Sequence, residues 1–352
     1  MSNKILFIAP SNSIHSHKWI NFFKNKNYNI SWISFYTAKN IDKKKIKYYD
    51  LSKNNFLKNY FLIKRLLKNE NFSTVHLHYI GRFSYLLIFL KIKRLIVTPW
   101  GSDIKLLKHN SIKFLITRKI LKMADLITVD ANYMIEILKK ISNNKKIVRI
   151  NFGTDTDFFK PAPNIAKDKF KIISLRNLEK IYSLETLIKA IEILKDRFKQ
   201  ELIVDIYGDG SENKNLKSLV KKLSLENIIN FKGKYDYDDL LKILNSYDLY
   251  VSTSTSDAGL AGSTSEAMSC GIIPLVSNNS ENEFWMSENS GFLFETKSYI
   301  DLAEKILKIK LLDDKNKNVI RVNSRNKIVN YNSFKNEMNK MHNQYKLHNE
   351  KN

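Results

Sequence analysis

The sequence predicts an α/β protein with two doubly wound parallel sheets, one after the other along the chain. Short apolar runs alternate with helical stretches, and this alternation starts again after residue 168. The length agrees with two domains, because 352 residues with 43% hydrophobic content exceed what one ordinary core holds.

In the first half, residues 4–9 (KILFIA) predict a buried strand. Trp19, Phe22 and Phe23 mark one face of the helix that follows, and residues 30–35 (ISWISF) predict the second strand. This beginning is typical of a parallel sheet with helices on its faces. Further strands of this half are expected at residues 75–78, 95–98 and 126–129.

The alternation restarts with a strand at residues 170–175 (FKIISL) and a helix at 184–198. Further strands are expected at 201–207, 228–231, 249–252 and 273–276. Between the halves, Pro161 and Pro163 mark a linker, because proline interrupts both helices and strand ladders.

These boundaries predict domains at residues 1–160 and 169–325, followed by a C-terminal helix at 326–352 that packs back toward the N-terminal domain. Ligands of open α/β sheets bind beyond the carboxyl ends of the strands. Two such sheets that face each other would form a cleft between the domains.

The net charge of +24 is concentrated in the first half. Residues 1–150 carry 29 basic and 7 acidic residues, a net charge of +22, and the remaining residues carry a net charge of +2. A basic half indicates an anionic partner, such as membrane headgroups, nucleic acid or a phosphorylated acceptor. Richness in Lys, Asn and Ile is also typical of AT-rich genomes, but it does not explain the asymmetry.

The protein is expected to be cytoplasmic. Its single cysteine, Cys270, cannot form an internal disulfide, which indicates a reducing compartment. The N-terminal apolar run is too short for a signal peptide, and no stretch approaches the roughly 18 apolar residues of a membrane span.

Two basic amphipathic stretches bear on membrane contact, at residues 55–69 and 111–123. Such helices lie on anionic membranes. The same apolar stripe would also suit a helix that packs on a sheet, with its lysines in solvent. The charge of this half favours a peripheral position on an anionic membrane, at the inner face of the plasma membrane.

Residues 256–271 (SDAGLAGSTSEAMSCG) carry the strongest sign of a ligand site. Gly259 and Gly262 let the backbone approach a ligand closely. A helix is expected to begin near Ser263, and its free N–H groups would suit a phosphate. The pattern Ser263-x-x-Glu266 also describes a capping box, which needs no ligand.

This segment resembles the signature "EAMACG" region of the family-four glycosyltransferases, the glycosyl transferases group 1. Seven further segments resemble the motifs of that family in the expected order. They are IHSHKW at 14–19, TPWGSD at 98–103, ADLITVD at 124–130, NFGTDTDFFKP at 151–161, IYGDG at 206–210, FKG at 231–233 and YDLYVS at 247–252.

The resemblance implies a GT-B fold, in which two Rossmann-like domains face an interdomain cleft. It also implies retaining transfer from a nucleotide-diphosphate sugar, with a UDP-sugar favoured, no cofactor and no metal. Arg176 and Glu266 would be the catalytic residues: Arg176 would hold the diphosphate, as a planar guanidinium can, and Glu266 would accept hydrogen bonds from the ribose. The alternative for Arg176 is a surface ion pair with Glu179.

The resemblance also implies residues that bind the two substrates. The donor residues are Gly208, Gly210, Lys180, Lys234, Asp257, Gly259, Leu260, Ala261, Gly262 and Ser263. The acceptor or cleft residues are Ser13, His15, His78, Trp100 and Asp103. No Cys/His or carboxylate spacing suggests a metal site.

The sequence departs from the family at two donor positions. The first glutamate of the family, eight residues before Glu266, is Ala258 here, and Asp257 could substitute only if the turn shifts. The basic residue after the arginine is also displaced, because Tyr182 occupies its position and Lys180 lies two residues earlier.

We therefore expect a hexosyl- or N-acetylhexosaminyltransferase that acts on a lipid-linked or cell-surface glycan at the membrane. Two alternatives remain open. One is a catalytically inactive GT-B-fold protein that binds a glycan or nucleotide, which Ala258 motivates. The other is a basic nucleic-acid-binding protein, although no recognition motif supports a nucleic-acid partner.

Overall fold

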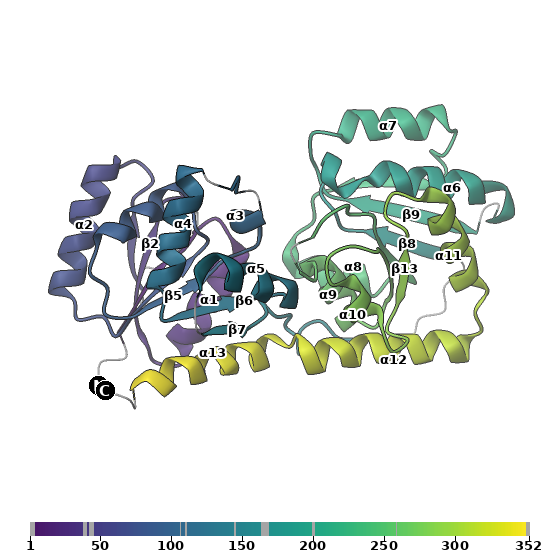
Figure 1. Cartoon of the computed structure of the whole chain (residues 1–352). Helices are drawn as coiled ribbons and strands as arrows, with labels where there is room; N and C mark the ends of the chain where they lie inside the picture. Colours follow the sequence, from purple (N-terminus) through teal and green to yellow (C-terminus); the bar gives the residue numbers. More distant parts are fainter. Residues whose placement is uncertain are drawn as a thin grey trace. The chain divides into compact units, whose positions relative to one another are not determined.

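The computed structural model describes residues 4–37, 41, 46–105, 107–109, 111–143, 146–162, 169–198, 201–257 and 259–349. The chain divides into two compact units, an N-terminal unit (Met1–Phe152 with Asn336–Asn352) and a C-terminal unit (Gly153–Lys335) (Figure 1). Each unit contains a parallel sheet flanked by helices, which confirms the predicted α/β fold class.

The N-terminal unit has a seven-stranded sheet in the order β3-β2-β1-β4-β5-β6-β7. Its strands are β1 (Lys4–Ile8), β2 (Asn29–Ser34), β3 (Lys47–Asp50), β4 (Thr74–His78), β5 (Leu95–Thr98), β6 (Leu126–Val129) and β7 (Ile147–Arg149). All neighbouring strands pair in parallel. The sequence did not predict the two edge strands, β3 and β7.

The helical segments of this unit are α1 (Ile14–Asn25), α2 (Phe56–Asn69), η1 (Arg82–Phe89), α3 (Ser102–Lys105), α4 (Ile112–Met123), α5 (Asn132–Ser142) and most of α13 (Phe334–Asn349). Helices α2 and α4 begin where the sequence predicts, because Asn55 and Ser111 act as N-caps through their side chains. On the other face of the sheet, Phe23 of α1 and Tyr345 of α13 pack ring against ring, 4.8 Å apart.

The C-terminal unit has a six-stranded parallel sheet in the order β10-β9-β8-β11-β12-β13. Its strands are β8 (Phe170–Ser174), β9 (Leu202–Tyr207), β10 (Ile229–Gly233), β11 (Leu249–Ser252), β12 (Ile273–Ser277) and β13 (Phe292–Phe294). Its helical segments are η2 (Lys180–Tyr182), α6 (Leu184–Phe198), α7 (Asn213–Lys222), η3 (Tyr237–Asp239), α8 (Leu240–Leu244), α9 (Gly262–Ser269), α10 (Asn282–Met286), α11 (Tyr299–Leu311) and α12 (Asp314–Tyr331).

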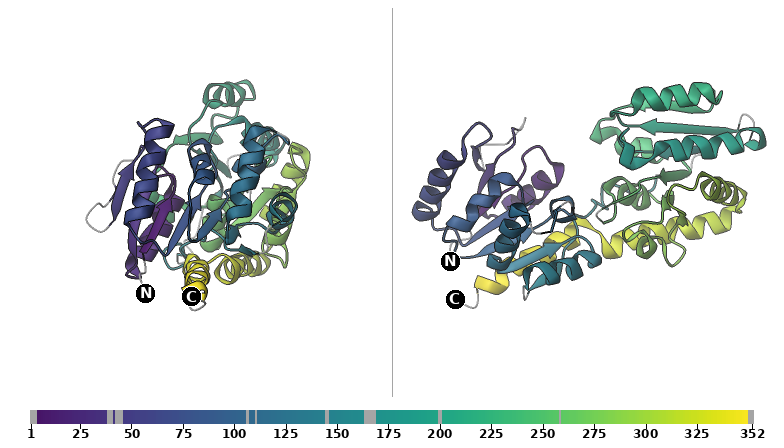
Figure 2. Two further views of the ribbon diagram at one scale, coloured as in Figure 1. Left: turned by 60° about the vertical axis from the view of Figure 1, so that its left-hand side comes forward. Right: turned by 45° about the horizontal axis from the view of Figure 1, so that its top comes forward.

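Two apolar layers cover this second sheet. Helices α6, α7 and α11 pack on one face and α8, α9 and α10 on the other (Figure 2), while α12 contributes Ile320 to the first layer and Ile328 to the second. Within the described ranges of the chain, no helix is long and apolar enough to cross a membrane.

Both sheets reverse their strand order at one place. In the N-terminal unit the reversal lies between β1 and β4, and in the C-terminal unit it lies between β8 and β11. At such a point the two loops leave the sheet in opposite directions, and ligands bind in the space between them. The loops after these four strands are therefore the first places to look for a site.

Three histidines are held neutral inside the N-terminal unit. Burial and Lys18 lower the pKa of His15 to about 4. Burial and His15 lower the pKa of His78 to about 3. The pKa of His76 lies well below its ordinary value because of burial first, and then His78 and a nearby arginine.

We expect acid to destabilise the folded protein as the pH falls below about 6.5. Below this pH the three histidines bind protons in the unfolded chain. In the folded protein His15 binds a proton only near pH 4, and His78 only near pH 3. Because the unfolded state binds more protons in this window, the stability that is present above pH 6.5 is progressively lost. Burial raises the pKa of Asp103 to about 6. Below that pH the folded protein binds a proton at Asp103 before the unfolded chain does, so this one group opposes the loss of stability.

Urea unfolding between pH 7.5 and pH 5 measures this dependence. The His78→Phe variant should show a smaller loss of stability on acidification, whereas His109→Gln, at an exposed histidine, should behave as the wild type. An unfolding free energy that stays constant across this range would contradict the buried neutral histidines.

Candidate functional site

Arg176 lies two residues after β8, at the reversal point of the C-terminal sheet, and its side chain is buried. Its Nη2 donates a hydrogen bond to Asp257 Oδ1 at 2.5 Å, which is also an ion pair. Its Cζ lies 4.3 Å from the centre of the Tyr182 ring. Glu179, the alternative partner, instead accepts hydrogen bonds from the backbone N and the Oγ of Ser211.

The guanidinium of Arg176 keeps its positive charge despite burial. Burial alone would lower its pKa, but the Asp257 carboxylate, with Tyr250 and Tyr182, raises the pKa above its ordinary value. Its buried Nε has no hydrogen-bond partner within the described residues. The end of β8 therefore presents a cation that is oriented by one carboxylate and one aromatic face.

Helix α9 begins at Gly262, and its N-cap, Ala261, makes no side-chain hydrogen bond to it. Ser263 lies inside the helix, and its Oγ is 2.8 Å from the hydroxyl of Tyr250 on β11. The capping-box interpretation is therefore wrong, because Ser263 does not occupy the N-cap. The first N–H groups of α9 and the positive end of its dipole are not neutralised by a capping side chain.

Glu266 is on α9, half-buried, and its Oε1 accepts a hydrogen bond of 3.4 Å from the hydroxyl of Tyr237. A neighbouring side of α9 is fixed to the rest of the unit. Ser265 Oγ accepts a hydrogen bond of 2.7 Å from Asn332 Nδ2 and lies 2.5 Å from Thr154 Oγ1. This anchoring fixes the position from which Glu266 projects.

The glycines of the predicted site have different roles. A Cβ on Gly208, whose φ is 122°, would lie 2.8 Å from the carbonyl oxygen of Arg176. A Cβ on Gly210 would overlap the backbone of Leu178. These two glycines therefore let the loop after β9 pack on the loop that carries Arg176. Gly262 differs, because a Cβ there would meet no atom within 4 Å.

The other predicted donor residues lie around these groups. Lys180 is exposed on η2, and Lys234, after β10, lies 3.8 Å from Asp209, with both side chains largely exposed. Gly259 is buried and Leu260 is half-buried in the loop before α9. Ala258 lies outside the described residues.

Sequence reasoning missed the tyrosines of this site. Tyr182 stacks on Arg176, Tyr237 donates to Glu266, and Tyr250 supports the first turn of α9. Burial raises the pKa of Tyr235 to about 12, and Glu266 adds to this effect. The displacement of the basic residue by Tyr182 was the one signal in the sequence that pointed to such a role.

In the N-terminal unit, two predicted residues support the backbone. Ser13 is the N-cap of α1 and accepts a hydrogen bond from His15 N. Asp103 is buried and accepts hydrogen bonds from Ile80 N at 2.8 Å and Trp100 N at 2.9 Å. Asp103 thereby joins the loop after β4 to the loop after β5.

His15, His78 and Trp100 come together in an aromatic cluster. The ring of His15 lies 6.0 Å from that of Trp100, and the ring of His78 lies 6.4 Å from it. His78 also packs edge-on against Trp19 at 4.9 Å. Neither ring nitrogen of His78 has a hydrogen-bond partner among the residues that the structure describes.

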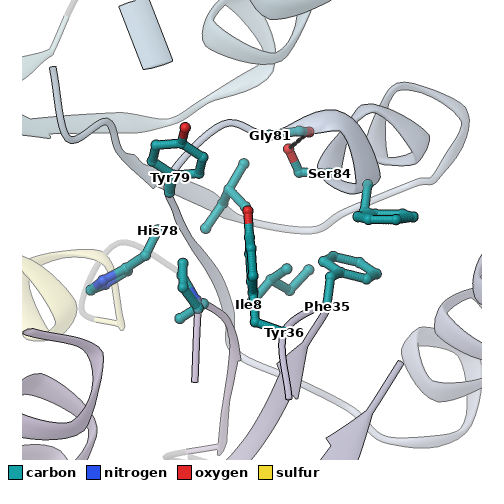
Figure 3. Close-up of a pocket in the computed structure, with 11 residues that line it drawn as sticks. Ile8, Phe35, Tyr36, His78, Tyr79, Gly81 and Ser84 are labelled. Atoms are coloured by element: carbon teal, nitrogen blue, oxygen red, sulfur yellow. Dashed lines mark hydrogen bonds between the residues drawn. The ribbon is translucent and has the colours of Figure 1, made fainter. Parts of the chain in front are cut away.

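A small pocket lies beside this cluster, at the carboxyl ends of β1, β2 and β4 (Figure 3). Eleven residues line it, most of them apolar or aromatic: Ile8, Ala9, Pro10, Phe35, Tyr36, Leu77, His78, Tyr79, Gly81, Phe83 and Ser84. The Phe35 and Phe83 rings stack at 5.2 Å. Of the predicted acceptor residues, only His78 lines this pocket.

Comparison with known families gives matches over both units. Residues 155–327 match the family described as Glycosyl transferases group 1, and residues 4–131 match that described as Glycosyl transferase 4-like. An uncharacterized glycosyltransferase of Methanocaldococcus jannaschii is 27% identical over 53% of this chain and 51% of the relative. A UDP-Gal:α-D-GlcNAc-diphosphoundecaprenol α-1,3-galactosyltransferase of Escherichia coli is 29% identical over 53% of this chain and 50% of the relative. The chain thus spans about half the length of these curated relatives.

Solved structures resemble the whole chain. A glycosyltransferase from Rickettsia africae has a TM-score of 0.80 and 21% identity, and the match covers 97% of both chains. HepE of Anabaena, solved in a complex with UDP, has a TM-score of 0.80 and 16% identity over 97% of this chain and 99% of its own. Together with the family matches, these similarities show that the chain belongs to the glycosyl transferases group 1 and has the two-domain GT-B fold.

Proposed function

We propose that this protein transfers a sugar from a nucleotide-diphosphate sugar, with a UDP-sugar favoured, to a lipid-linked or cell-surface glycan at a membrane. The transfer is of the hexosyl or N-acetylhexosaminyl type, retains the anomeric configuration and needs no metal. The E. coli relative, whose name specifies a UDP-sugar and a diphosphoundecaprenol acceptor, supports both substrate classes.

The observation that carries this proposal is the convergence of Arg176 and the start of α9 at the reversal point of the second sheet. Asp257 connects them, because it binds Arg176 and lies in the loop that leads into α9. A cation and an uncapped helix N-terminus at one place form a site for a diphosphate. Asp257 is then a positioning residue that acts on the donor through Arg176.

In the proposed reaction, the acceptor hydroxyl oxygen forms a bond to the anomeric carbon, and the bond from that carbon to the phosphate oxygen breaks. The proton of the hydroxyl goes to the departing phosphate oxygen on the same face of the sugar. Arg176 and the N-terminus of α9 stabilise the charge that develops on the leaving diphosphate. Glu266 holds the nucleotide by accepting hydrogen bonds from the ribose.

A membrane-facing surface is the second part of the proposal. Helices α2 and α4 both contact η1, and all three expose large apolar side chains. The exposed fraction is 65% for Leu57, 63% for Phe61 and 77% for Ile112. Because the sheet does not cover these side chains, core packing does not account for them. The surrounding lysines and the charge of +22 would favour anionic headgroups.

Release of UDP from UDP-glucose, UDP-galactose and UDP-N-acetylglucosamine tests the proposed activity, with a bacterial lipid extract or water as acceptor and with EDTA present. Arg176→Lys should lower kcat roughly 100-fold, because lysine keeps the charge but loses the planar fork. Glu266→Gln should raise the donor KM about 10-fold through weaker hydrogen bonds.

Arg197→Lys, at an exposed position on α6, is the matched control and should leave both constants unchanged. A folded Arg176→Lys protein with the wild-type kcat would contradict the proposed role of Arg176. Tight donor binding without any UDP release would instead favour an inactive binding protein.

Sedimentation with lipid vesicles tests the membrane-facing surface. The wild type should bind vesicles with 30% phosphatidylserine and should not bind pure phosphatidylcholine. Raising the salt to 0.5 M NaCl should weaken the binding, because salt screens charges: the Debye length falls from about 8 Å at 0.15 M to about 3 Å at 1 M. The double variant Leu57→Glu, Phe61→Glu should weaken vesicle binding at least about 10-fold. Each substitution removes an apolar side chain whose burial in the membrane is worth about 1.5–3 kcal/mol. Ile300→Glu, at an exposed isoleucine of the C-terminal unit, should have no effect. Equal binding by all three proteins would contradict this surface.

A further inference from the structure

Tyr250 places a phenol hydroxyl inside the second sheet's core. It lies on β11, beside Ile173 of β8 and Pro274 of β12, and its side chain is fully buried in the apolar layer on the α9 side of the sheet. For packing alone, a phenylalanine would fill this position, whereas a buried hydroxyl is unfavourable unless it forms hydrogen bonds. The hydroxyl of Tyr250 therefore needs an explanation beyond the core.

Two hydroxyls of the first turn of α9 contact the Tyr250 hydroxyl. Ser263 Oγ lies 2.8 Å from Tyr250 Oη, and Thr264 Oγ1 donates a hydrogen bond to Tyr250 Oη at 3.2 Å. The two residues differ in their surroundings, because Thr264 is buried while Ser263 is half-buried. Next to Ser263, a Cβ on Gly262 would meet no atom of the described residues within 4 Å, so the start of the helix borders open space.

The hydrogens of these three hydroxyls can be assigned one by one. The Thr264 hydrogen points to Tyr250 Oη, so the hydrogen of Tyr250 itself is left for Ser263 Oγ. With Thr264 as a donor, the reverse direction would leave the buried Tyr250 hydrogen without an acceptor among the described residues, which is unfavourable. Burial raises the pKa of Tyr250, so the phenol keeps this hydrogen near neutral pH. The Ser263 hydrogen is then not used within these three hydroxyls and can be donated to a ligand at the start of α9.

The same phenol interacts with the Arg176 guanidinium. Burial lowers the pKa of Arg176, but Asp257 and then Tyr250 raise it above its ordinary value. The buried Nε of Arg176 has no hydrogen-bond partner among the residues that the structure describes. Tyr250 is thus linked to both groups that are proposed to hold the diphosphate, the guanidinium and the first turn of α9.

We propose that Tyr250 is a positioning residue for the donor: by donating its phenol hydrogen to Ser263 Oγ, it makes the Ser263 hydroxyl a hydrogen-bond donor to the diphosphate of the nucleotide sugar. Ser263 then adds a neutral donor to the N–H groups of α9 and the charge of Arg176. A hydroxyl that is oriented in advance needs little reorganisation as charge develops on the leaving diphosphate. This assignment rests on the proposed function, because it needs a nucleoside diphosphate in this site.

Calorimetric titration of the full chain with UDP and with GDP tests this role, and saturation-transfer NMR measures binding of the corresponding nucleosides, which carry no phosphate. Tyr250→Phe keeps the buried ring and removes only the hydroxyl. We expect it to weaken binding of the nucleoside diphosphate roughly fivefold, the effect of one hydrogen bond, and to leave nucleoside binding unchanged. Tyr299→Phe, at an exposed tyrosine of α11, is the matched control and should bind both ligands as the wild type does.

Ser263→Ala breaks the same hydrogen bond from its other end and separates this role from simple anchoring of α9. If Tyr250 acts through Ser263, the double variant Tyr250→Phe, Ser263→Ala should bind the nucleoside diphosphate no more weakly than Ser263→Ala alone. Anchoring predicts a further loss in the double variant, because Tyr250→Phe also removes the bond from Thr264. It also predicts an equal loss for the nucleoside, since Glu266 lies on the same helix. Either result overturns the inference.

The two proposals fail in different ways. Unchanged binding of the nucleoside diphosphate by Tyr250→Phe overturns the role of Tyr250 and leaves the proposed transfer from a nucleotide sugar standing. A wild type that binds neither UDP nor GDP contradicts the proposed function itself, and the role of Tyr250 falls with it.

Discussion

Parallel pairing constrains every candidate site in this protein, because all strands of a parallel sheet end at the same edge. Arg176 follows β8 and Asp257 follows β11, and the pairing of these two strands brings together side chains that are 81 positions apart. The same constraint gathers Pro10, Tyr36 and Tyr79 around one pocket in the first sheet. The chemistry of both units depends on loops that the sheets hold at their carboxyl edges.

The ion pair between Arg176 and Asp257 shows how the second unit keeps a buried cation. A buried charge without a partner is strongly unfavourable, and Asp257 provides that partner. Because Asp257 belongs to the loop before α9, the pair also fixes the cation relative to the helix N-terminus. A diphosphate at this place would be a second anion for a guanidinium that is already oriented, so little reorganisation is needed on binding.

Elements with strong local signals were predictable from the sequence. The bounds predicted from continuous apolar runs for β5, β6 and β11 agree with the structure, and so do the bounds predicted from apolar periodicity for α6. The edge strands β3, β7 and β13 have three or four residues, and an edge strand does not require a long apolar run. The details of the site were harder to predict from the sequence, because they arise from tertiary contacts. The need for glycine at 208 and 210, the position of Ser263 inside α9 and the positive φ of Tyr79 all depend on neighbouring loops.

The central claim is that a nucleoside diphosphate binds in the open space before α9, and thermal unfolding with added UDP tests it most directly. A Cβ at position 262 meets no atom within 4 Å, so Gly262→Ala should unfold at the wild-type temperature, while its methyl group occupies space that the diphosphate needs. We predict that UDP raises the wild-type midpoint by mass action, with EDTA present, and raises that of Gly262→Ala clearly less. A wild-type midpoint that neither UDP nor GDP moves, with or without magnesium, would contradict the account.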